Sequence, residues 1–436
     1  MHKVTFITLG CKLNQAETAM LIQDFEDRGY CVVGNETLAD VGVINTCTVT
    51  GRSASKCRQA IRKLQKMNPE MTLIVTGCYS QVDSREVAEL KGVDYILGVQ
   101  EKLKVFEYFQ HPGKMKQPVI AVQALSEARE ADLHPVGNYQ NQTRAYLKIQ
   151  NGCDRRCAYC IVPMARGASR SVPEKSIIEQ VQKLIKDGFK EIVLTGVHVG
   201  DYGKELHPKC FSMLPSLLNE LGSIFENTRF RISSTDPGDM TDELIGVVKQ
   251  HPNICRHFHI PIQSGSNDVL KNMNRNYTTE YVSSVIQTIQ SKIGVVGLGA
   301  DVIVGFPGET DEQFEETYQF IQSQPFSYLH VFPFSVRKGT KAASMLNKVD
   351  SKIITKRAQK LRKLGTKMKQ QWLSQWKGQT VDVLLESRNL NDRISGFTSE
   401  YARVEVPYQV TLHNKIVQVE IIGLASSLLK GRVVND

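Results

Sequence analysis

Three closely spaced cysteines are the residues of this sequence with the clearest chemistry. Cys153, Cys157 and Cys160 lie in the string Cys-Asp-Arg-Arg-Cys-Ala-Tyr-Cys. Thiolates bind soft metals, and iron–sulfur clusters are held almost entirely by cysteine. Four ligands would complete a cubane cluster, whereas three leave one iron with the open position that marks a catalytic site. A structural zinc site is the alternative, but it needs a fourth ligand, which His198 or Cys210 could supply only by folding back. The spacing therefore favours a catalytic iron–sulfur site.

A second set of three cysteines is dispersed along the first third of the chain. Cys11, Cys47 and Cys78 each follow an apolar, β-branched run of strand length. The three runs are Lys3–Gly10, Val41–Thr46 and Met71–Gly77. Because the carboxyl ends of parallel strands share one edge of a sheet, three such thiols would converge there, beside helix N-termini that favour thiolates. Each cysteine alone could be a buried structural thiol, but three at matching positions favour a second metal or cluster site.

The number of cysteines and the length of the apolar runs indicate the cellular compartment of the protein. The chain has 436 residues and ten cysteines, too few for a disulfide framework of that length. No apolar run approaches the ~20 residues that span a bilayer. The stretch Val4–Leu9 is also shorter than the apolar region of a signal peptide. We therefore expect a cytoplasmic protein with no membrane partner.

Alternating strands and helices position the dispersed cysteines. The further elements predicted in this region are helices Ala16–Arg28, Ser53–Met67 and Ser84–Lys91 and the strand Tyr95–Gly98. Strands that alternate with helices predict a parallel sheet with helices on its faces. We assign residues 1–110 to this N-terminal domain. Residues 111–142, which are polar and contain several prolines and glycines, are predicted to form a linker.

A second α/β series carries the closely spaced cysteines. Its predicted strands are Tyr146–Gln150, Glu191–Gly196, Phe230–Thr235, His257–Gln263, Gly299–Phe306 and Tyr328–Phe334. Each gap has room for a helix, and the clearest is Glu174–Asp187, whose apolar residues recur on one face. Six such units predict an open (β/α)6 barrel over residues 143–340, with its catalytic edge at the carboxyl ends of the strands. The cysteines follow the first strand and would lie at that edge.

The residue pattern changes in the last part of the sequence. A basic helix is expected near Ser351–Trp376, within a helical connector at residues 341–376. Short strands separated by turn residues then predict a small antiparallel β-barrel over residues 377–436. Its predicted strands are Gln379–Glu386, Arg393–Thr398, Tyr401–Val406, Val410–Leu412, Lys415–Ile422 and Gly431–Val434.

Positive charge is concentrated in one segment. The chain has a net charge of +9, yet the 41 residues from Arg337 to Lys377 contain thirteen Lys/Arg and one acid, so the rest of the chain is net negative. A second basic group lies on the helix after Cys47: Arg52, Lys56, Arg58, Arg62, Lys63 and Lys66. Most charge runs are solvated helix faces. Two of them, one beside a cysteine site, favour a polyanionic substrate such as RNA.

Longer strings around both cysteine sets carry a family resemblance. Cys153-x3-Cys157-x2-Cys160, with Tyr159 before the last cysteine, resembles the motif of radical S-adenosylmethionine (SAM) enzymes. The other strings resemble the methylthiotransferases of that superfamily, over essentially the whole chain. They are Leu9-Gly10-Cys11-Lys12-Leu13-Asn14-Gln15-Ala16-Glu17, Ile44-Asn45-Thr46-Cys47-Thr48-Val49, Thr76-Gly77-Cys78-Tyr79-Ser80-Gln81, Asn151-Gly152-Cys153, Pro261-Ile262-Gln263-Ser264-Gly265-Ser266 and Asp301-Val302-Ile303-Val304-Gly305-Phe306-Pro307-Gly308-Glu309-Thr310. The C-terminal barrel resembles the TRAM domain of this family.

The resemblance implies two 4Fe–4S clusters and SAM. One cluster, which binds SAM and supplies the catalytic radical, would be held by Cys153, Cys157 and Cys160. An auxiliary cluster, which carries the sulfur, would be held by Cys11, Cys47 and Cys78. Candidate contacts to SAM lie at the ends of the barrel strands: Thr195, Gly196, Ser233, Ser234, Gln263, Ser264 and Gly305.

Within the family, the strings around Cys47 and Cys153 are most similar to the branch that acts on N6-threonylcarbamoyladenosine (t6A) in tRNA. This similarity implies addition of a methylthio group to C2 of t6A at tRNA position 37, next to the anticodon. The implied partners are the anticodon loop and an electron donor such as flavodoxin or ferredoxin. One departure from the family lies in Met164–Arg170, where Met164 and Ala165 replace an aromatic residue and an arginine.

Three alternatives stay open on the sequence. A methylthiotransferase could act on isopentenyladenosine in tRNA or on a ribosomal protein, although the basic segment argues against the protein substrate. A radical enzyme could transfer only methyl or only sulfur, but the second cysteine set argues against this alternative. A non-catalytic, metal-stabilised RNA-binding protein belongs to a different class. It would not need two large α/β domains with three cysteines at each site.

Overall fold

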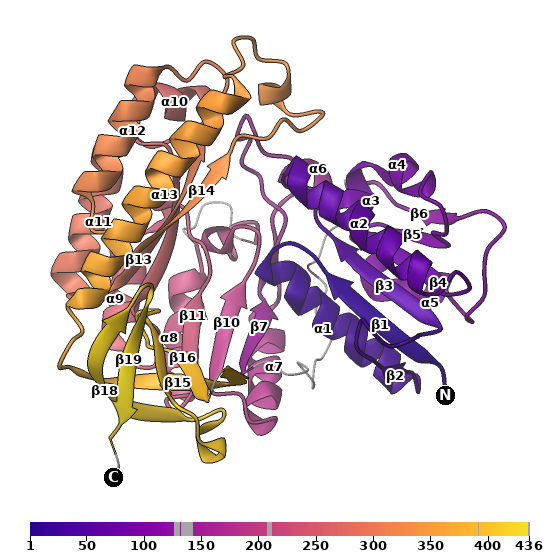
Figure 1. The fold of residues 1–436 in the computed structure, drawn as a ribbon, viewed down its shortest axis with the longest axis horizontal. Coiled ribbons are helices and arrows are strands. Elements are labelled where there is room, and N and C mark those ends of the chain that lie inside the picture. Colours follow the sequence, from indigo (N-terminus) through magenta and orange to yellow (C-terminus); the bar gives the residue numbers. More distant parts are fainter. Residues whose placement is uncertain (126–130, 132–142, 207–211, 391, 435–436) are drawn as a thin grey trace.

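The computed structural model describes residues 1–125, 131, 143–206, 212–390 and 392–434 (Figure 1). An N-terminal sheet domain lies beside an incomplete barrel, and a small β-barrel lies at the end of the large barrel remote from the cysteine loop. Half of the predicted linker, and Cys210, fall outside the described residues. None of the described helices is long and apolar enough to cross a membrane.

The N-terminal domain is a six-stranded, fully parallel sheet in the order β2-β1-β3-β4-β5-β6. Its strands are β1 (Lys3–Thr8), β2 (Cys31–Val32), β3 (Val41–Thr46), β4 (Thr72–Gly77), β5 (Tyr95–Leu97) and β6 (Val119–Ala121). Its helices are α1 (Lys12–Asp27), α2 (Gly51–Met67), α3 (Cys78–Val82), α4 (Ser84–Ala88) and α5 (Val105–Tyr108). Every residue of β3 and β4 is buried, as expected for apolar strands covered on both faces.

Two details of this domain differ from the sequence prediction. Strand β6 lies inside the segment predicted as a linker, so the sheet extends past residue 110. Only three residues long, it has too little pattern to stand out among prolines and glycines. The helix predicted over Ser84–Lys91 ends at Ala88. The other domain limits stay predictions.

The second series forms the predicted open barrel of six parallel strands. They are β7 (Arg144–Lys148), β10 (Glu191–Thr195), β11 (Arg229–Ile232), β12 (His257–Gln263), β13 (Gly297–Val304) and β14 (Tyr328–Pro333). Two three-stranded sheets, β11-β10-β7 and β12-β13-β14, are joined between β11 and β12 by the bridges Phe230–Ile254 and Ser234–His259. The covering helices are α7 (Glu174–Lys186), α8 (Leu214–Ile224), α9 (Asp242–Gln250), α10 (Asn267–Asn272), α11 (Thr279–Ile293) and α12 (Asp311–Ser323).

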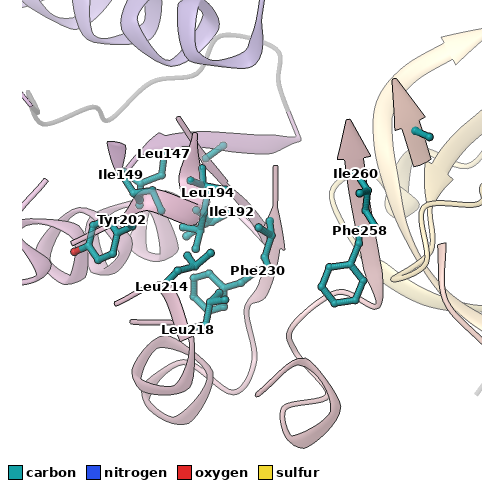
Figure 2. Packing of buried hydrophobic residues seen from close by; sticks show 14 of the residues in the cluster. Leu147, Ile149, Ile192, Leu194, Tyr202, Leu214, Leu218, Phe230, Phe258 and Ile260 are labelled. Atoms are coloured by element: carbon teal, nitrogen blue, oxygen red, sulfur yellow. The ribbon is translucent and has the colours of Figure 1, made fainter. Parts of the chain in front are cut away.

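Residues of alternating character line the two faces of each barrel strand. Apolar side chains, such as Leu147, Ile192 and Phe230, pack beneath the helices in the main core (Figure 2). Most of the intervening positions are polar and point into the lumen, where Arg231 pairs with Glu191 at 2.7 Å and His259 pairs with Asp301 at 3.0 Å. A period of two along a strand separates these faces. The barrel therefore encloses a polar lumen within an apolar shell.

The two free edges of the barrel are covered by helices from outside it. Helix α13 (Ser351–Ser374), the predicted basic helix, packs against β14, and α1 packs against β7. Gly365 permits the close approach of α13, because a Cβ there would lie 3.2 Å from the Cβ of Leu329. The N-terminal domain thus contributes one wall of the barrel.

The C-terminal domain is a closed barrel in the order β15-β16-β17-β19-β18. Its strands are β15 (Thr380–Leu390), β16 (Arg393–Phe397), β17 (Arg403–Pro407), β18 (Ile416–Ala425) and β19 (Leu428–Val433). The strand predicted at Val410–Leu412 is wrong. These residues form a 3₁₀ turn with Val410 exposed, so the apolar side chain is not a sign of a buried strand.

A loop of this small barrel closes the amino end of the large barrel. The guanidinium of Arg231 donates to the carbonyls of Thr398 and Ser399 at 3.1 and 2.9 Å. A Cβ on Gly297, at the start of β13, would lie 1.9 Å from the carbonyl oxygen of Glu400. Only glycine admits the loop so close to the strand, and the small barrel thus covers the amino end of the large barrel at β11 and β13.

Candidate active site

The closely spaced cysteines follow the first barrel strand, at the carboxyl end of the lumen. Gly152 precedes them with φ +76°, and a Cβ there would lie 1.8 Å from the carbonyl oxygen of Ala168. The amide of Cys153 donates to the carbonyl of Gly167 at 3.0 Å. Glycine is required because the two arms of the loop touch at this point. The cysteine loop is thereby anchored to the segment that follows α6 (Val162–Arg166).

A buried glutamine that sequence reasoning missed organises this loop. The Gln150 side-chain NH₂ donates to the carbonyl of Gly152 at 2.8 Å and to the hydroxyl of Ser169 at 2.9 Å. Its side-chain oxygen accepts from the amides of Val197 and His198 at 3.0 and 2.8 Å. One side chain thus ties together the segments that follow β7 and β10. Its polar character at the end of an apolar strand was the only available signal.

Charged partners surround the closely spaced thiols. Arg275 donates from Nη1 to the Cys157 sulfur at 3.2 Å, and Cys153 hydrogen-bonds to His198. His198 therefore lies beside one of the three cysteines, whereas the sequence indicated that it could reach them only if the chain folded back. Burial disfavours the charged imidazole, but hydrogen bonds to Asp201 and Asp239, both 2.7 Å away, outweigh it and raise the pKa of His198 to about 11.

The dispersed cysteines converge at the edge predicted for them. Gly10 and Gly77 precede two of them with φ +109° and +101°. A Cβ on Gly10 would lie 2.7 Å from the Cβ of Cys47, which shows how closely the loops after β1 and β3 approach. The strand order reverses between these two strands, which is where open α/β sheets bind ligands.

The two cysteine sets differ from single-ion sites. A zinc–sulfur bond of 2.3 Å in tetrahedral geometry puts sulfur atoms about 3.8 Å apart. Among the described residues, the groups of three metal-binding donors that lie within 4.8 Å of one another are Cys153–His198–Asp201 and His259–Asp301–His330. Neither cysteine set is among them. Arg275 lies beside Cys157 and Arg166 beside Cys78, so each set has a cation next to one of its sulfur atoms.

Arg166 connects the two sets. It is 2% exposed, and its Nε lies 3.3 Å from the sulfur of Cys78. Its two terminal nitrogens pair with Glu17 of α1 at 2.8 and 3.0 Å, and also donate to Asn14 at 2.6 Å. Lys102 pairs with the same carboxylate at 2.5 Å. Burial opposes ionisation of Glu17, but Arg166 and Lys102 outweigh it and hold its pKa well below the usual range. The loop Met164–Arg170 therefore joins the two domains.

The predicted cofactor-contact residues all lie at the carboxyl ends of barrel strands, as the strand assignment requires: Thr195, Gly196, Ser233, Ser234, Gln263, Ser264 and Gly305. Some have structural partners already. The hydroxyl of Ser264 lies 3.0 Å from that of Thr317, and the amide of Gly305 donates to Glu309 at 2.7 Å. Gln263 has φ +66°, a left-handed conformation that is uncommon outside glycine.

The two basic segments meet beside the mouth of the lumen. On α13, Lys352, Lys356, Lys363 and Lys367 are exposed and recur on one helical face, while Leu361 and Leu364 are buried on the opposite one. The first residue of α2, Gly51, donates from its amide to the Ser335 hydroxyl at 2.9 Å, and Arg337 hydrogen-bonds to Thr48. The amino ends of the two basic segments thus lie side by side where the two domains meet.

Comparisons with known proteins agree with this geometry. Residues 147–321 match the Radical SAM superfamily, and residues 3–98 match "Uncharacterized protein family UPF0004". The whole chain is 40% identical to the threonylcarbamoyladenosine tRNA methylthiotransferase MtaB of Bacillus subtilis, covering 98% of it. It is 33% identical to the tRNA-2-methylthio-N(6)-dimethylallyladenosine synthase of Methylacidiphilum infernorum, with 97% of this chain and 92% of the relative aligned.

A solved structure shows the same fold at low sequence identity. The radical SAM methyltransferase TsrM from Kitasatospora setae has a TM-score of 0.54 and 14% identity, over 78% of this chain and 77% of that one.

The barrel and its cysteine loop define the chain as a radical SAM enzyme. Because relatives 33–40% identical align over nearly their full length, the chain belongs to the methylthiotransferase family of radical SAM enzymes.

The Arg166–Glu17 pair gives a stability prediction. Arg166→Gln leaves the buried Glu17 carboxylate without its main cation, so we expect the free energy of unfolding of the cluster-free protein to fall by about 3–5 kcal/mol. Urea denaturation measures this change. The matched control is Lys360→Gln, which removes a half-exposed pair with Glu315 at 2.7 Å and should cost less than about 1 kcal/mol. Equal, small losses for both variants would contradict the proposed importance of the buried pair.

Proposed function

We propose that this enzyme adds a methylthio group to C2 of N6-threonylcarbamoyladenosine at position 37 of tRNA, beside the anticodon, and uses two 4Fe–4S clusters to do so. The observation that carries the proposal is the convergence of two three-cysteine sites at one mouth, joined by Arg166. The similarity to a t6A methylthiotransferase over the whole chain supports the choice of substrate.

The residues present fit two iron–sulfur clusters. Cys153, Cys157 and Cys160 would hold the cluster that binds SAM, and Cys11, Cys47 and Cys78 would hold the auxiliary one. Bound with SAM, the first cluster supplies the radical chemistry needed at the unreactive C2–H bond of adenine. An external electron donor such as flavodoxin or ferredoxin would reduce it.

The protein's own residues fix the geometry of this chemistry. Gln150 and Gly152 hold the cysteine loop, and Arg275 donates a hydrogen bond to the Cys157 sulfur. Arg166 belongs to the barrel domain and contacts Cys78 and α1 of the N-terminal domain. These buried contacts set the distance between the two cysteine sites. The strand-end residues Thr195, Gly196, Ser233, Ser234, Gln263, Ser264 and Gly305 are the proposed surroundings of SAM.

The basic surface is the proposed tRNA contact. The stripe on α13 and the exposed cations of α2 are the proposed contacts to the phosphates of the anticodon arm. The C-terminal barrel contributes less positive charge, because residues 378–436 contain six Lys/Arg and seven Asp/Glu. In this protein that domain closes the lumen, and α13 provides the charge.

A second candidate substrate is isopentenyladenosine in tRNA, which the 33% identity to a dimethylallyladenosine synthase favours. The two candidates differ in charge, because the threonylcarbamoyl group ends in a carboxylate and the isopentenyl group is an uncharged hydrocarbon.

The cluster assignment predicts a defined iron content. After anaerobic reconstitution, the wild-type protein should contain about eight irons per chain, and either Cys11→Ala/Cys47→Ala/Cys78→Ala or Cys153→Ala/Cys157→Ala/Cys160→Ala should contain about four. Iron and sulfide analysis with electron paramagnetic resonance measures this. Cys31→Ala, which changes an exposed cysteine remote from both sites, should keep about eight. Four irons in both the wild type and the first triple variant would refute the auxiliary cluster.

The substrate assignment is tested by mass spectrometry of the products. The reconstituted enzyme, with SAM, a reductant and sulfide, should convert t6A in tRNA to its 2-methylthio derivative. It should leave tRNA bearing isopentenyladenosine, and intact ribosomes, unmodified or much more slowly modified. A product found only on isopentenyladenosine, or only on a ribosomal protein, would replace the proposed substrate with that one.

The α13 stripe predicts a salt-dependent affinity. Lys356→Gln/Lys363→Gln/Lys367→Gln should weaken tRNA binding and reduce the steepness of log K against log salt concentration by about 2–3, since each phosphate contact contributes about 0.7–0.9. Filter binding across a salt series measures this. The control Lys175→Gln/Lys186→Gln/Lys249→Gln removes three exposed lysines from α7 and α9 and should leave the slope unchanged. Equal slopes for both variants would exclude α13 from the tRNA contact.

A further inference from the structure

Two histidines and an aspartate form a group of metal-binding donors in the large barrel, apart from the cysteines. His259 of β12, Asp301 of β13 and His330 of β14 lie on three adjacent strands. Their strand neighbours Phe258 and Val302 pack in the apolar core beneath the helices, so the three polar side chains face the lumen. They precede the last residues of their strands by three or four positions, about 10–13 Å at 3.3 Å per residue. The group therefore lies deeper in the barrel than the strand-end residues proposed to surround SAM.

Strand register and distances match the surroundings of a metal ion. Asp301 and His330 are direct partners between β13 and β14, and His259 lies on the other side of β13. The His259 Nε2 lies 3.0 Å and the His330 Nδ1 lies 3.1 Å from one oxygen, Oδ1 of Asp301. An ion about 2.1 Å from each donor would put two donors about 3.0 Å apart at a right angle and about 3.4 Å apart at the tetrahedral angle. Two imidazoles and one carboxylate are a donor set for Zn²⁺ and Fe²⁺.

The imidazole of His259 is held as a metal ligand would be. The residue is 8% exposed, and its Nδ1 lies 2.6 Å from the hydroxyl of Ser234. When Nδ1 donates its proton to this hydroxyl, Nε2 keeps the lone pair that binds a metal. Among the described residues Nε2 has no hydrogen bond of acceptable geometry, although Oδ1 of Asp301 is only 3.0 Å away. Because a buried polar atom without a partner is costly, a hydrogen-bonded network does not account for this group.

Tyr328 fixes the orientation of the buried rings. Its ring is nearly parallel to that of His259, with a centroid distance of 5.9 Å and an interplanar angle of 4°. Its hydroxyl lies 2.9 Å from Nε2 of His257, so that imidazole nitrogen is already engaged. A Cβ on Gly299 would lie 2.1 Å from Cζ of Tyr328, and glycine thus makes room for the phenol ring. The imidazole of His259 is therefore held in place before any ion arrives.

We propose that His259, Asp301 and His330 bind a divalent first-row transition-metal ion such as Zn²⁺, in addition to the iron–sulfur clusters. The His330 side chain is 54% exposed, so the ion can reach the group from the lumen. Binding replaces the hydrogen bond between His330 and Asp301, because a ligating imidazole nitrogen must be deprotonated. Three protein donors leave a coordination position open, as in catalytic zinc sites, and water or a substrate oxygen would complete it.

The test measures zinc on the holoenzyme, whose cysteines are already occupied by iron. Protein reconstituted anaerobically to its full iron and sulfide content is incubated with Zn²⁺, desalted and analysed by mass spectrometry for zinc and by X-ray absorption at the zinc edge. We expect about one zinc per chain, with nitrogen and oxygen neighbours at about 2.0–2.1 Å and no sulfur neighbour at about 2.3 Å.

Variants locate the ion. His259→Gln/Asp301→Asn/His330→Gln should lose this zinc and keep its iron. The matched control His2→Gln/Asp40→Asn changes an exposed histidine–aspartate pair at 3.6 Å in the N-terminal domain and should keep both metals. Ser234→Ala, which removes the hydroxyl beside Nδ1 of His259, should weaken zinc affinity by about 10- to 100-fold in calorimetric titration without SAM.

Three results would overturn the inference. A wild-type holoenzyme with full iron content that retains no zinc would do so without any variant. Sulfur neighbours in the X-ray absorption spectrum would assign the zinc to cysteines, and full retention of zinc in the triple variant would assign it to another part of the chain. None of these results depends on which base of tRNA is modified, so the inference and the proposed function are tested separately.

Discussion

The buried ion pair between Arg166 and Glu17 is the contact on which the rest of the structure depends. Arg166 belongs to the loop that carries one cysteine set, and Glu17 belongs to the helix that begins beside the other. Neither charge is tolerable in the interior without its partner. The pair therefore makes the relative position of the two domains a property of the folded core, and the two sites keep a fixed separation.

Much of this architecture follows from local sequence pattern. The alternation of strands and helices predicted the parallel sheet, the six-unit barrel and the shared edge at which Cys11, Cys47 and Cys78 meet, because side-chain period and strand direction are local properties. The pattern missed β6, which is three residues long. It also predicted a strand at Val410–Leu412, whose apolar residues lie in a turn. Whether such a short segment forms a strand depends on the neighbouring strands with which it can pair.

The contacts that build the site were beyond sequence reasoning for a related reason. Gln150, Arg166 and His198 act through partners up to 152 residues away in the chain, and nothing in their immediate neighbours indicates those contacts. His198 was considered only as an improbable zinc ligand, yet it lies beside Cys153 and is held between two carboxylates. Long-range hydrogen bonds depend on the folded topology, which a linear pattern does not contain.

The loop around Glu400 covers the amino end of the large barrel, which leaves the carboxyl end, beside the cysteine loop, as the side that a nucleotide can approach. A base that is stacked in an RNA loop is shielded by its neighbours, so its nucleotide must first be unstacked and swung out of the loop, at a cost of a few kcal/mol. The modified nucleotide must leave from the same side. The small C-terminal barrel thus decides from which end the large barrel can be used.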